Sequence, residues 1–287
     1  MSERFDELVR LMAKLRAPDG CPWDRKQTHE SLKPYLVEEA YEVLETIDRK
    51  DPENLREELG DLLLQILFHA QIGTEAGRFT IDEIMQHLAE KLVRRHPHVF
   101  GSSTEGGDPL HADEVYARWE QIKRDERKQA GQSGSALDGV PKTLPALLRA
   151  FQIQARASRV GFDWPRIGQV VEKLEEELRE LRDAMASASP DAVSTTSNRA
   201  HDEIQGRVES EFGDVLFALV NLARFVKVNP EEALRKAINR FTDRFHYVET
   251  QAASSGRTLN EMTLGEMAAL WEAAKRMRAP HPAGTDT

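Results

Sequence analysis

The chain has 287 residues, enough for two domains that each bury a hydrophobic core, and its formal charge of −10 argues against binding to the phosphate backbone of a nucleic acid. The lone cysteine, Cys21, excludes an internal disulfide bond, and the polar start Met1–Arg4 lacks the features of a signal peptide, so a cytoplasmic protein is expected. The apolar run Leu62–Leu64 is interrupted at Gln65, far short of the roughly 20 residues of a membrane span, so no membrane partner is expected.

The pattern of apolar residues predicts an all-α fold. Apolar residues recur at three- and four-residue spacing along almost the whole chain, and alternating β-branched runs are missing. The first informative helices carry paired acids: Glu39 and Glu42 on one, Glu58 and Asp61 on the next. Because the members of each pair are three residues apart, their carboxylates lie on one side of a helix, about one turn apart, and can converge on one ion.

The next predicted helix carries paired cations. A capping box formed by Thr80 and Glu83 marks its start, and Lys91 and Arg95 lie one turn apart towards its end. These cations are candidates for binding phosphate groups, although cations in this position often only complement the helix dipole.

A tryptophan and a lysine follow on another predicted helix. Trp119 and Lys123 lie four residues apart, on one face, as a candidate contact for a nucleoside base or sugar. A buried tryptophan beside a surface lysine would give the same local pattern.

A segment rich in glycine, serine and proline then interrupts the helical pattern. We interpret residues 131–147 as a linker between an N-terminal module, residues 1–130, and a C-terminal module, residues 148–287. A second interruption, Ser187–Ser197, lies within the C-terminal module and is expected to be a long loop between two helices, extending as far as Gln205.

The C-terminal module repeats the pattern of the first. Paired acids recur, then a helix start at Asn229 with Pro230 and Glu232, and then the cations and the tryptophan at matching offsets. The repeated residues are Glu177, Glu180, Glu211, Asp214, Arg240, Arg244, Trp271 and Lys275. Recurrence of all three features favours function over coincidence.

The four acid helices share one register. Relative to the first carboxylate of each pair, apolar residues fall at −3, +1, +4 and +8, so each acid is predicted to lie beside an apolar seam that forms the core. Four carboxylates gathered at the edge of a core would repel one another strongly without a cation. Carboxylate oxygens are hard ligands, which favours Mg²⁺ over zinc, with Mn²⁺ or Ca²⁺ as alternatives. The alternative interpretation is a pair of charged hairpins on the surface of a scaffold.

The motifs together resemble the MazG family. The resemblance covers nearly the whole chain and rests on the acid pairs with Cys21–Asp24, Gln27–Leu32, Arg94–Phe100, Asp138–Pro141, Leu144–Leu147 and Val160–Trp164. It implies tandem four-helix-type modules, a homodimer, and Mg²⁺-dependent cleavage of nucleoside triphosphates, canonical and aberrant, to a nucleoside monophosphate and pyrophosphate.

The resemblance also implies roles for individual residues. In the C-terminal module the four acids would bind the metal, Arg240 and Arg244 the phosphates, and Trp271 and Lys275 the nucleotide. Arg207 stands where related proteins can carry lysine, whereas the N-terminal module has Asn54 in the matching place. We therefore expect the C-terminal site to be the better catalyst. Glu177 and Glu211 are its candidate catalytic carboxylates, with Glu177 the first candidate for the base that accepts a proton from the attacking water.

Two other functions remain open at this point. A pyrophosphohydrolase restricted to dUTP, dCTP or phosphoribosyl-ATP could use the same acids with different base contacts. A helical adaptor protein could bind a stabilising ion at the same positions. A P-loop NTPase is disfavoured because the sequence has no glycine-rich loop ending in Gly-Lys-Ser or Gly-Lys-Thr.

Overall fold

The computed structural model describes residues 3–101, 111–129, 134–187 and 198–277. These residues form helices joined by turns and loops, without a strand, which confirms the all-α prediction. None of the described helices is long and apolar enough to cross a membrane. Contacts within the chain divide it into two compact units, Met1–Gln132 and Ser133–Thr287.

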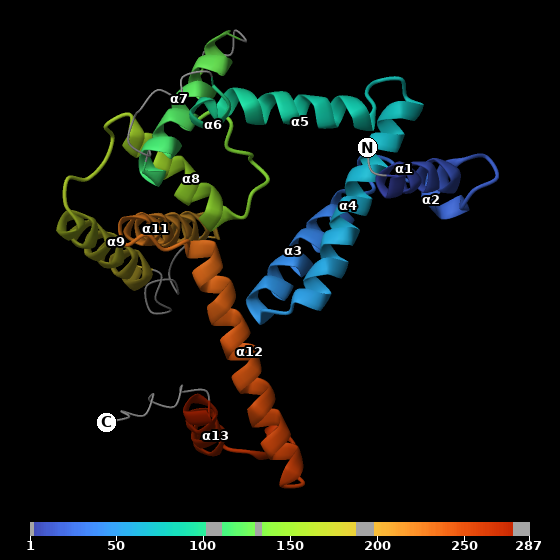
Figure 1. Ribbon diagram of the computed structural model, residues 1–287. Coiled ribbons are helices and arrows are strands. Elements are labelled where there is room, and N and C mark those ends of the chain that lie inside the picture. The colour runs from blue at the N-terminus through green and yellow to red at the C-terminus, as the bar shows by residue number, and fades with distance from the viewer. Residues whose placement is uncertain (1–2, 102–110, 130–133, 188–197, 278–287) are drawn as a thin grey trace, which may run out of the picture. The chain divides into compact units, whose positions relative to one another are not determined.

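The first unit contains seven helices among its described residues (Figure 1). They are α1 (Glu3–Arg16), α2 (Pro22–Lys26), α3 (Lys33–Arg49), α4 (Pro52–Glu75), α5 (Ile81–Arg95), α6 (Pro97–Phe100) and α7 (Ala112–Gln129). α3 and α4 form an antiparallel hairpin, α1 packs on α4, and α5 contacts α4, α6 and α7. Its hydrophobic core contains Met12, Leu32, Leu67 and Phe68, which join α1, the loop before α3, and α4.

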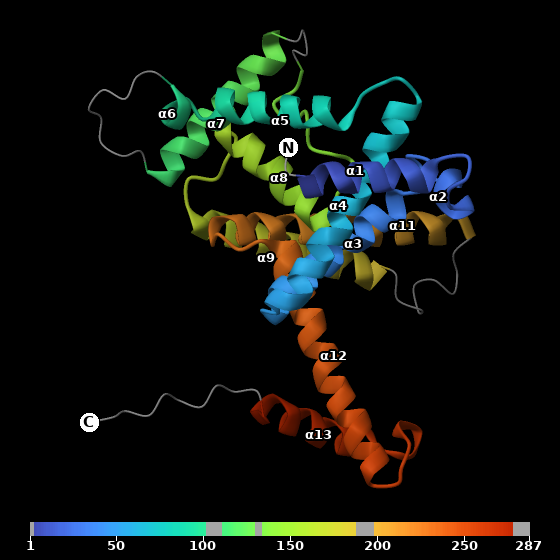
Figure 2. The same cartoon turned by 45° about the vertical axis from the view of Figure 1, so that its right-hand side comes forward.

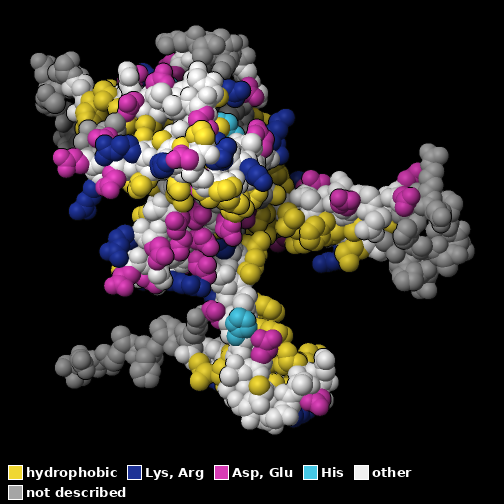
Figure 3. Space-filling model, turned by 90° about the vertical axis from the view of Figure 1, so that its right-hand side faces the viewer, with side chains coloured by type: hydrophobic (Ala, Val, Ile, Leu, Met, Phe, Trp, Pro, Cys, Tyr) yellow, Lys and Arg dark blue, Asp and Glu magenta, His cyan; other side chains and the backbone are white. Residues whose placement is uncertain are grey.

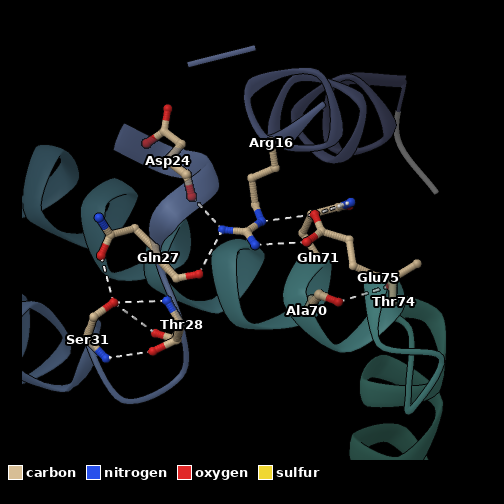
Figure 4. A network of polar contacts seen from close by, with 9 residues as sticks. All are labelled: Arg16, Asp24, Gln27, Thr28, Ser31, Ala70, Gln71, Thr74 and Glu75. Atoms are coloured by element: carbon tan, nitrogen blue, oxygen red, sulfur yellow. Dashed lines mark hydrogen bonds and ion pairs between the residues drawn. The ribbon is translucent and has the colours of Figure 1, made fainter. Parts of the chain in front are cut away.

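A buried arginine connects α1, the α2 segment and α4 (Figure 4). The guanidinium of Arg16 donates to both carboxylate oxygens of Glu75, at 2.9 and 2.8 Å, and to the backbone carbonyls of Asp24 and Gln27. The Arg16 side chain is only 6% exposed. Its hydrogen bonds hold the pKa of Glu75 below the usual value. This network fixes the segment after α1 against α4, which is one of the two acid helices of this unit.

The second unit repeats this arrangement (Figures 1 and 2). Its helices are α8 (Ala146–Arg159), α9 (Ile167–Ser187), α11 (Asn198–Phe225), α12 (Pro230–Ser254) and α13 (Leu264–Met277), with a 3₁₀ turn, η1 (Leu259–Glu261), before the last. α9 and α11 form the hairpin that corresponds to α3 and α4, and α8 packs on α11 as α1 packs on α4. α12 contacts α8 and α11 and carries α13.

The predicted helix starts are largely confirmed. Thr80 and Glu83 form both bonds of a capping box at α5. Asn229 caps α12 by accepting from the backbone of Glu232 at 3.2 Å. The reciprocal bond of that cap is missing, because the Glu232 side chain pairs with Arg235 and Lys236 instead.

The interruption inside the C-terminal module is shorter than predicted. α9 extends to Ser187 and α11 begins at Asn198, so Asn198–Gln205 are helical rather than loop. Residues 188–197 lie outside the described residues. The periodicity of Ile204 and Val208 continues the apolar pattern of the acid helix upstream, which explains why the helix starts earlier.

The prediction that the apolar seam forms the core was wrong for a single chain. Eight seam residues of the four acid helices are between 36% and 56% exposed: Leu36, Ile47, Leu59, Ile66, Leu178, Met185, Phe212 and Leu219. The buried face is rotated from the seam and includes Gln65 and Phe68 in α4. In the space-filling view, exposed hydrophobic side chains border a dense group of acidic ones (Figure 3). The hairpins therefore pack on α1 and α8 with one face and leave the seam uncovered.

Candidate metal centre

Three of the four acids predicted in the N-terminal module come together between α3 and α4. One carboxylate oxygen each from Glu39, Glu58 and Asp61 lies within 4.8 Å of the others. Burial and the neighbouring charges of Asp61 and Glu42 raise the pKa of Glu39. The pKa of Glu58 is also raised, by burial, by Glu42 and by Asp61. Glu42, the fourth acid, thus adjoins the same cluster.

The C-terminal module builds the same cluster between α9 and α11. Oxygens of Glu177, Glu180 and Glu211 lie within 4.8 Å of one another. Glu177 is buried, with 8% of its surface exposed, although it is an acid. Burial and the charges of Glu177 and Glu211 raise the pKa of Glu180. Asp214, the fourth acid, lines a pocket together with Glu177.

The donor set fits a hard divalent cation. All the clustered ligand atoms are carboxylate oxygens, which suit Mg²⁺, Mn²⁺ or Ca²⁺. Opposite ligands of Mg²⁺ are about 4.2 Å apart, since each Mg–O bond is about 2.1 Å. Adjacent ligands of the same octahedral ion are only about 3.0 Å apart, so oxygens within 4.8 Å of one another still have to move together by up to about 1.8 Å to bind one ion. Mutually repelling carboxylates, among them the buried Glu177, are a physical reason for a cation to bind here.

A lysine that the sequence analysis missed lies beside the C-terminal cluster. Lys173 Nζ contacts a carboxylate oxygen of Glu176 at 2.6 Å and one of Glu177 at 2.9 Å. Hydrogen bonds to these two glutamates raise the pKa of Lys173. Its position four residues before Glu177 was the available signal, because i,i+4 pairs of this kind meet on a helix. Lys173 thus partly neutralises the cluster.

In the N-terminal module the predicted cation lies against the predicted tryptophan. The same cation, however, already forms an ion pair with an acidic side chain. The guanidinium of Arg95 lies 5.9 Å from the ring centre of Trp119, and Lys123 Nζ lies 4.0 Å from it. Arg95 also donates to Glu126 with N–O distances from 2.6 to 3.3 Å, and Arg94 pairs with the same carboxylate. These bonds lower the pKa of Glu126 to about 2.

In the C-terminal module the corresponding residues also meet. The guanidinium of Arg244 lies 5.7 Å from the ring centre of Trp271, and Phe241 packs against the same ring at 5.0 Å. Among the described residues Arg244 has no ion pair comparable to that of Arg95 with Glu126. Lys275 pairs with Glu272 at 2.6 Å.

The structure does not bring these cations to the acids within one chain. Trp271 and Lys275 lie on α13, which sits at the end of α12 remote from α9 and α11 in both ribbon views (Figures 1 and 2). Arg240 and Lys91 lie on α12 and α5, outside both acid clusters. Of the cations predicted from the sequence, Arg207 alone in the described part of the chain pairs with an acid of a cluster, with its Nε 4.0 Å from Glu211. Its counterpart Asn54 instead bonds to Asp51 at the start of α4.

A pocket of about 610 Å³ opens beside the C-terminal acids, and the sequence analysis did not foresee it. Its lining comes from α8, α9, α11, the turn after α8 and Leu137 in the segment before α8, and it includes Glu177 and Asp214. Gly161, at a φ of 89°, ends α8 with bonds from Gly161 to Ser158 and from Phe162 to Ala157. This turn aims the next residues at the pocket.

Comparisons with known proteins assign the chain to a family. The model of the MazG nucleotide pyrophosphohydrolase domain matches it twice, over residues 27–100 and 168–248. The nucleoside triphosphate pyrophosphohydrolase/pyrophosphatase MazG of Thermotoga maritima is 46% identical over 94% of this chain and 95% of its own length. The nucleoside triphosphate pyrophosphohydrolase of Escherichia coli K12 is 44% identical over 95% and 97%. An uncharacterised Bacillus subtilis protein is 45% identical over 94% of this chain and 51% of its own length. Each matched segment contains one acid cluster.

Proposed function

The chain belongs to the MazG nucleotide pyrophosphohydrolase family, and we propose from this that it cleaves nucleoside triphosphates to a nucleoside monophosphate and pyrophosphate in a Mg²⁺-dependent reaction. The observation that carries the proposal is the convergence of Glu177, Glu180 and Glu211 from two packed helices. Such a cluster suits a cation that also binds phosphate oxygens. The resemblance of the chain to full-length relatives with this activity supports the reaction type.

The residues of the chain have distinct roles in the proposed reaction. Glu177, Glu180, Glu211 and Asp214 would hold Mg²⁺, or Mn²⁺ in its place. When bound, the cation would supply a Lewis acid that neutralises phosphate charge and lowers the pKa of water. Water attacks the α-phosphorus in line, and pyrophosphate leaves.

Proton transfer falls to a carboxylate of the same cluster. Glu177 is buried within the cluster, and Lys173 holds its carboxylate at 2.9 Å, so it has a fixed position from which to accept the proton of the attacking water. Glu211 is the second candidate, because one of its carboxylate oxygens lies within 4.8 Å of those of Glu177 and Glu180. Arg240 and Arg244 would neutralise the leaving pyrophosphate once a second copy of the chain brings α12 to the acids.

We assign the better catalytic site to the C-terminal module. In the N-terminal module Arg95 already forms an ion pair with Glu126, and the side chain of Asn54 is hydrogen-bonded at the start of α4. The second unit keeps a cation, Arg207, beside its acids and an Arg244 without a comparable ion pair among the described residues. A phosphate ligand would have to displace Glu126 before it could use Arg95, which costs the charge-assisted hydrogen bonds.

We also propose that the enzyme acts as a homodimer. α12 carries Leu234, Ile238, Phe241 and Phe245 on one stripe, each at least 36% exposed, with the alternating spacing of four and three residues that is typical of helix association. The acid helices leave their own apolar seams uncovered as well. A second copy of the chain would cover these surfaces, and it offers a way to bring α12 and α13 to the acids.

The substrate range is proposed to include both canonical and aberrant nucleoside triphosphates, in the cytoplasm. The test is to measure pyrophosphate and monophosphate release from a panel of ribonucleotides, deoxyribonucleotides and damaged nucleotides, with Mg²⁺ and with chelator. We expect release that depends on Mg²⁺, and Glu177→Gln should lower kcat about a hundredfold or more. Glu39→Gln in the N-terminal cluster should cost much less. Release of inorganic phosphate instead of pyrophosphate would refute the proposal.

A further inference from the structure

The pocket beside the C-terminal acids contains a buried acceptor without a partner. Gln154 of α8 is 7% exposed, and its Nε2 donates to the backbone carbonyl of Phe217 at 2.8 Å. This bond fixes the orientation of the amide, so Oε1 is the free end. Among the described residues Oε1 has no hydrogen-bond partner, although it is buried. An unsatisfied buried acceptor costs free energy until a donor reaches it.

The rest of the pocket suits a flat, partly polar ring. Phe162 and Trp164 contribute aromatic surface from the turn after α8, and Asn221 contributes an amide. Phe162 is 82% exposed, so its ring is available to a ligand. The volume of about 610 Å³ is within the range of pockets that hold small molecules. Glu177 and Asp214 form one side, so a ligand in the pocket would extend directly to the acid cluster.

The N-terminal module has larger side chains at the matching positions. When positions are counted from the first acid of each pair, Tyr35 corresponds to Lys173. In the same way Gln65 corresponds to Ala218, and Phe68 corresponds to Asn221. Gln65 and Phe68 are each 4% exposed. Trp23, after α1, packs edge-on against Tyr35 at 5.8 Å and against Phe68 at 6.4 Å. In that module, aromatic packing fills the positions that line the pocket in the other.

We propose that this pocket binds the nucleobase at the C-terminal site and that Gln154 selects bases with an exocyclic amino group. An amino group donates to Gln154 Oε1, whereas a carbonyl in the same place would oppose it. Gln154 cannot turn its amide to suit a carbonyl without losing the bond to Phe217. The larger side chains at the matching positions of the N-terminal module leave less room for a base, which adds a second reason for unequal sites. The inference deepens the proposed function and rests on it.

Two pairs of substrates isolate the amino group. CTP differs from UTP, and ATP from ITP, by an amino group in place of a carbonyl. One hydrogen bond of typical strength makes kcat/KM about fivefold higher for CTP than for UTP, and for ATP than for ITP. Gln154→Leu should bring both ratios to about one. Equal kcat/KM within both pairs for the wild-type protein would overturn the role of Gln154.

The pocket itself is tested by filling it. The double substitution Ala218→Gln and Asn221→Phe copies the residues that the N-terminal module accommodates at matching positions. We expect the Kd for α,β-methylene-CTP, measured by calorimetry with Mg²⁺, to rise at least tenfold, since the base loses its place. The rise in melting temperature with Mg²⁺ alone should remain, which shows that the variant is folded and its acids are intact. Glu209→Gln, at an exposed position of α11, is the matched control.

The two proposals fail in different ways. An unchanged Kd in the filled variant overturns the pocket, even if the wild-type protein releases pyrophosphate. If the wild-type protein releases no pyrophosphate but the filled variant loses analogue binding, the proposed reaction is refuted and the base pocket is supported, because the analogue titration needs no turnover.

Discussion

Glu177→Gln should abolish most of the stabilisation that Mg²⁺ gives to the second unit. The substitution keeps the size of a residue that is only 8% exposed, but it removes one charge from a cluster whose oxygens lie within 4.8 Å of one another. At a Mg²⁺ concentration a hundred times Kd, binding stabilises the folded wild-type unit by about 2.7 kcal/mol. For a unit of about 150 residues each kcal/mol moves the melting temperature by about 2–4 °C, so the expected rise is about 5–11 °C.

The same arithmetic gives the result for the variant. If the substitution weakens binding about a hundredfold, the same Mg²⁺ concentration stabilises the unit by only about 0.4 kcal/mol, or roughly 1 °C. The assay is thermal unfolding across a Mg²⁺ titration, at constant ionic strength. Glu175→Gln, two residues away on an exposed part of α9, removes the same charge and should keep the full rise. An equal rise in Glu177→Gln and the wild-type protein would refute the assignment of this cluster as a metal site.

Three further predictions concern pH, folding and assembly. Glu126 has a pKa of about 2, below its usual value of 4.5, so its contribution to stability is present above about pH 4.5 and is lost as the pH falls towards 2. Glu126→Gln should therefore lower the melting temperature at pH 7, and the gap to the wild-type protein should narrow on titration to pH 3; a constant gap would contradict the ion pairs with Arg94 and Arg95. Arg16→Met should destabilise the first unit by about 2 kcal/mol in urea unfolding, because it leaves Glu75 and two carbonyls without their donor. Ile238→Glu should shift a dimer towards monomer in sedimentation, whereas Glu249→Gln on the same helix should not; a monomeric wild-type protein would exclude the proposed dimer.

The sequence was sufficient for the features that depend on spacing along one helix. The all-α fold, the cap at Thr80 and the i,i+3 acid pairs follow from local periodicity, because the geometry of a helix determines which residues share a face. The repeat of Glu39 and Glu58 as Glu177 and Glu211 also indicated where acids gather, since each hairpin brings three of its four predicted acids within 4.8 Å of one another.

Tertiary structure alone decided which faces are buried and which charges are already paired. Periodicity identifies an apolar stripe but not what covers it, so the seam that includes Phe212 was predicted to be core although it is 54% exposed. The bond of Gln154 to Phe217, and the pairing of Glu126 with Arg95, join residues from different helices. No pattern along one helix specifies such contacts, because they depend on how separate helices pack. The acid pairs could therefore be identified from the sequence, whereas the pocket beside them and the difference between the modules depend on how the helices pack.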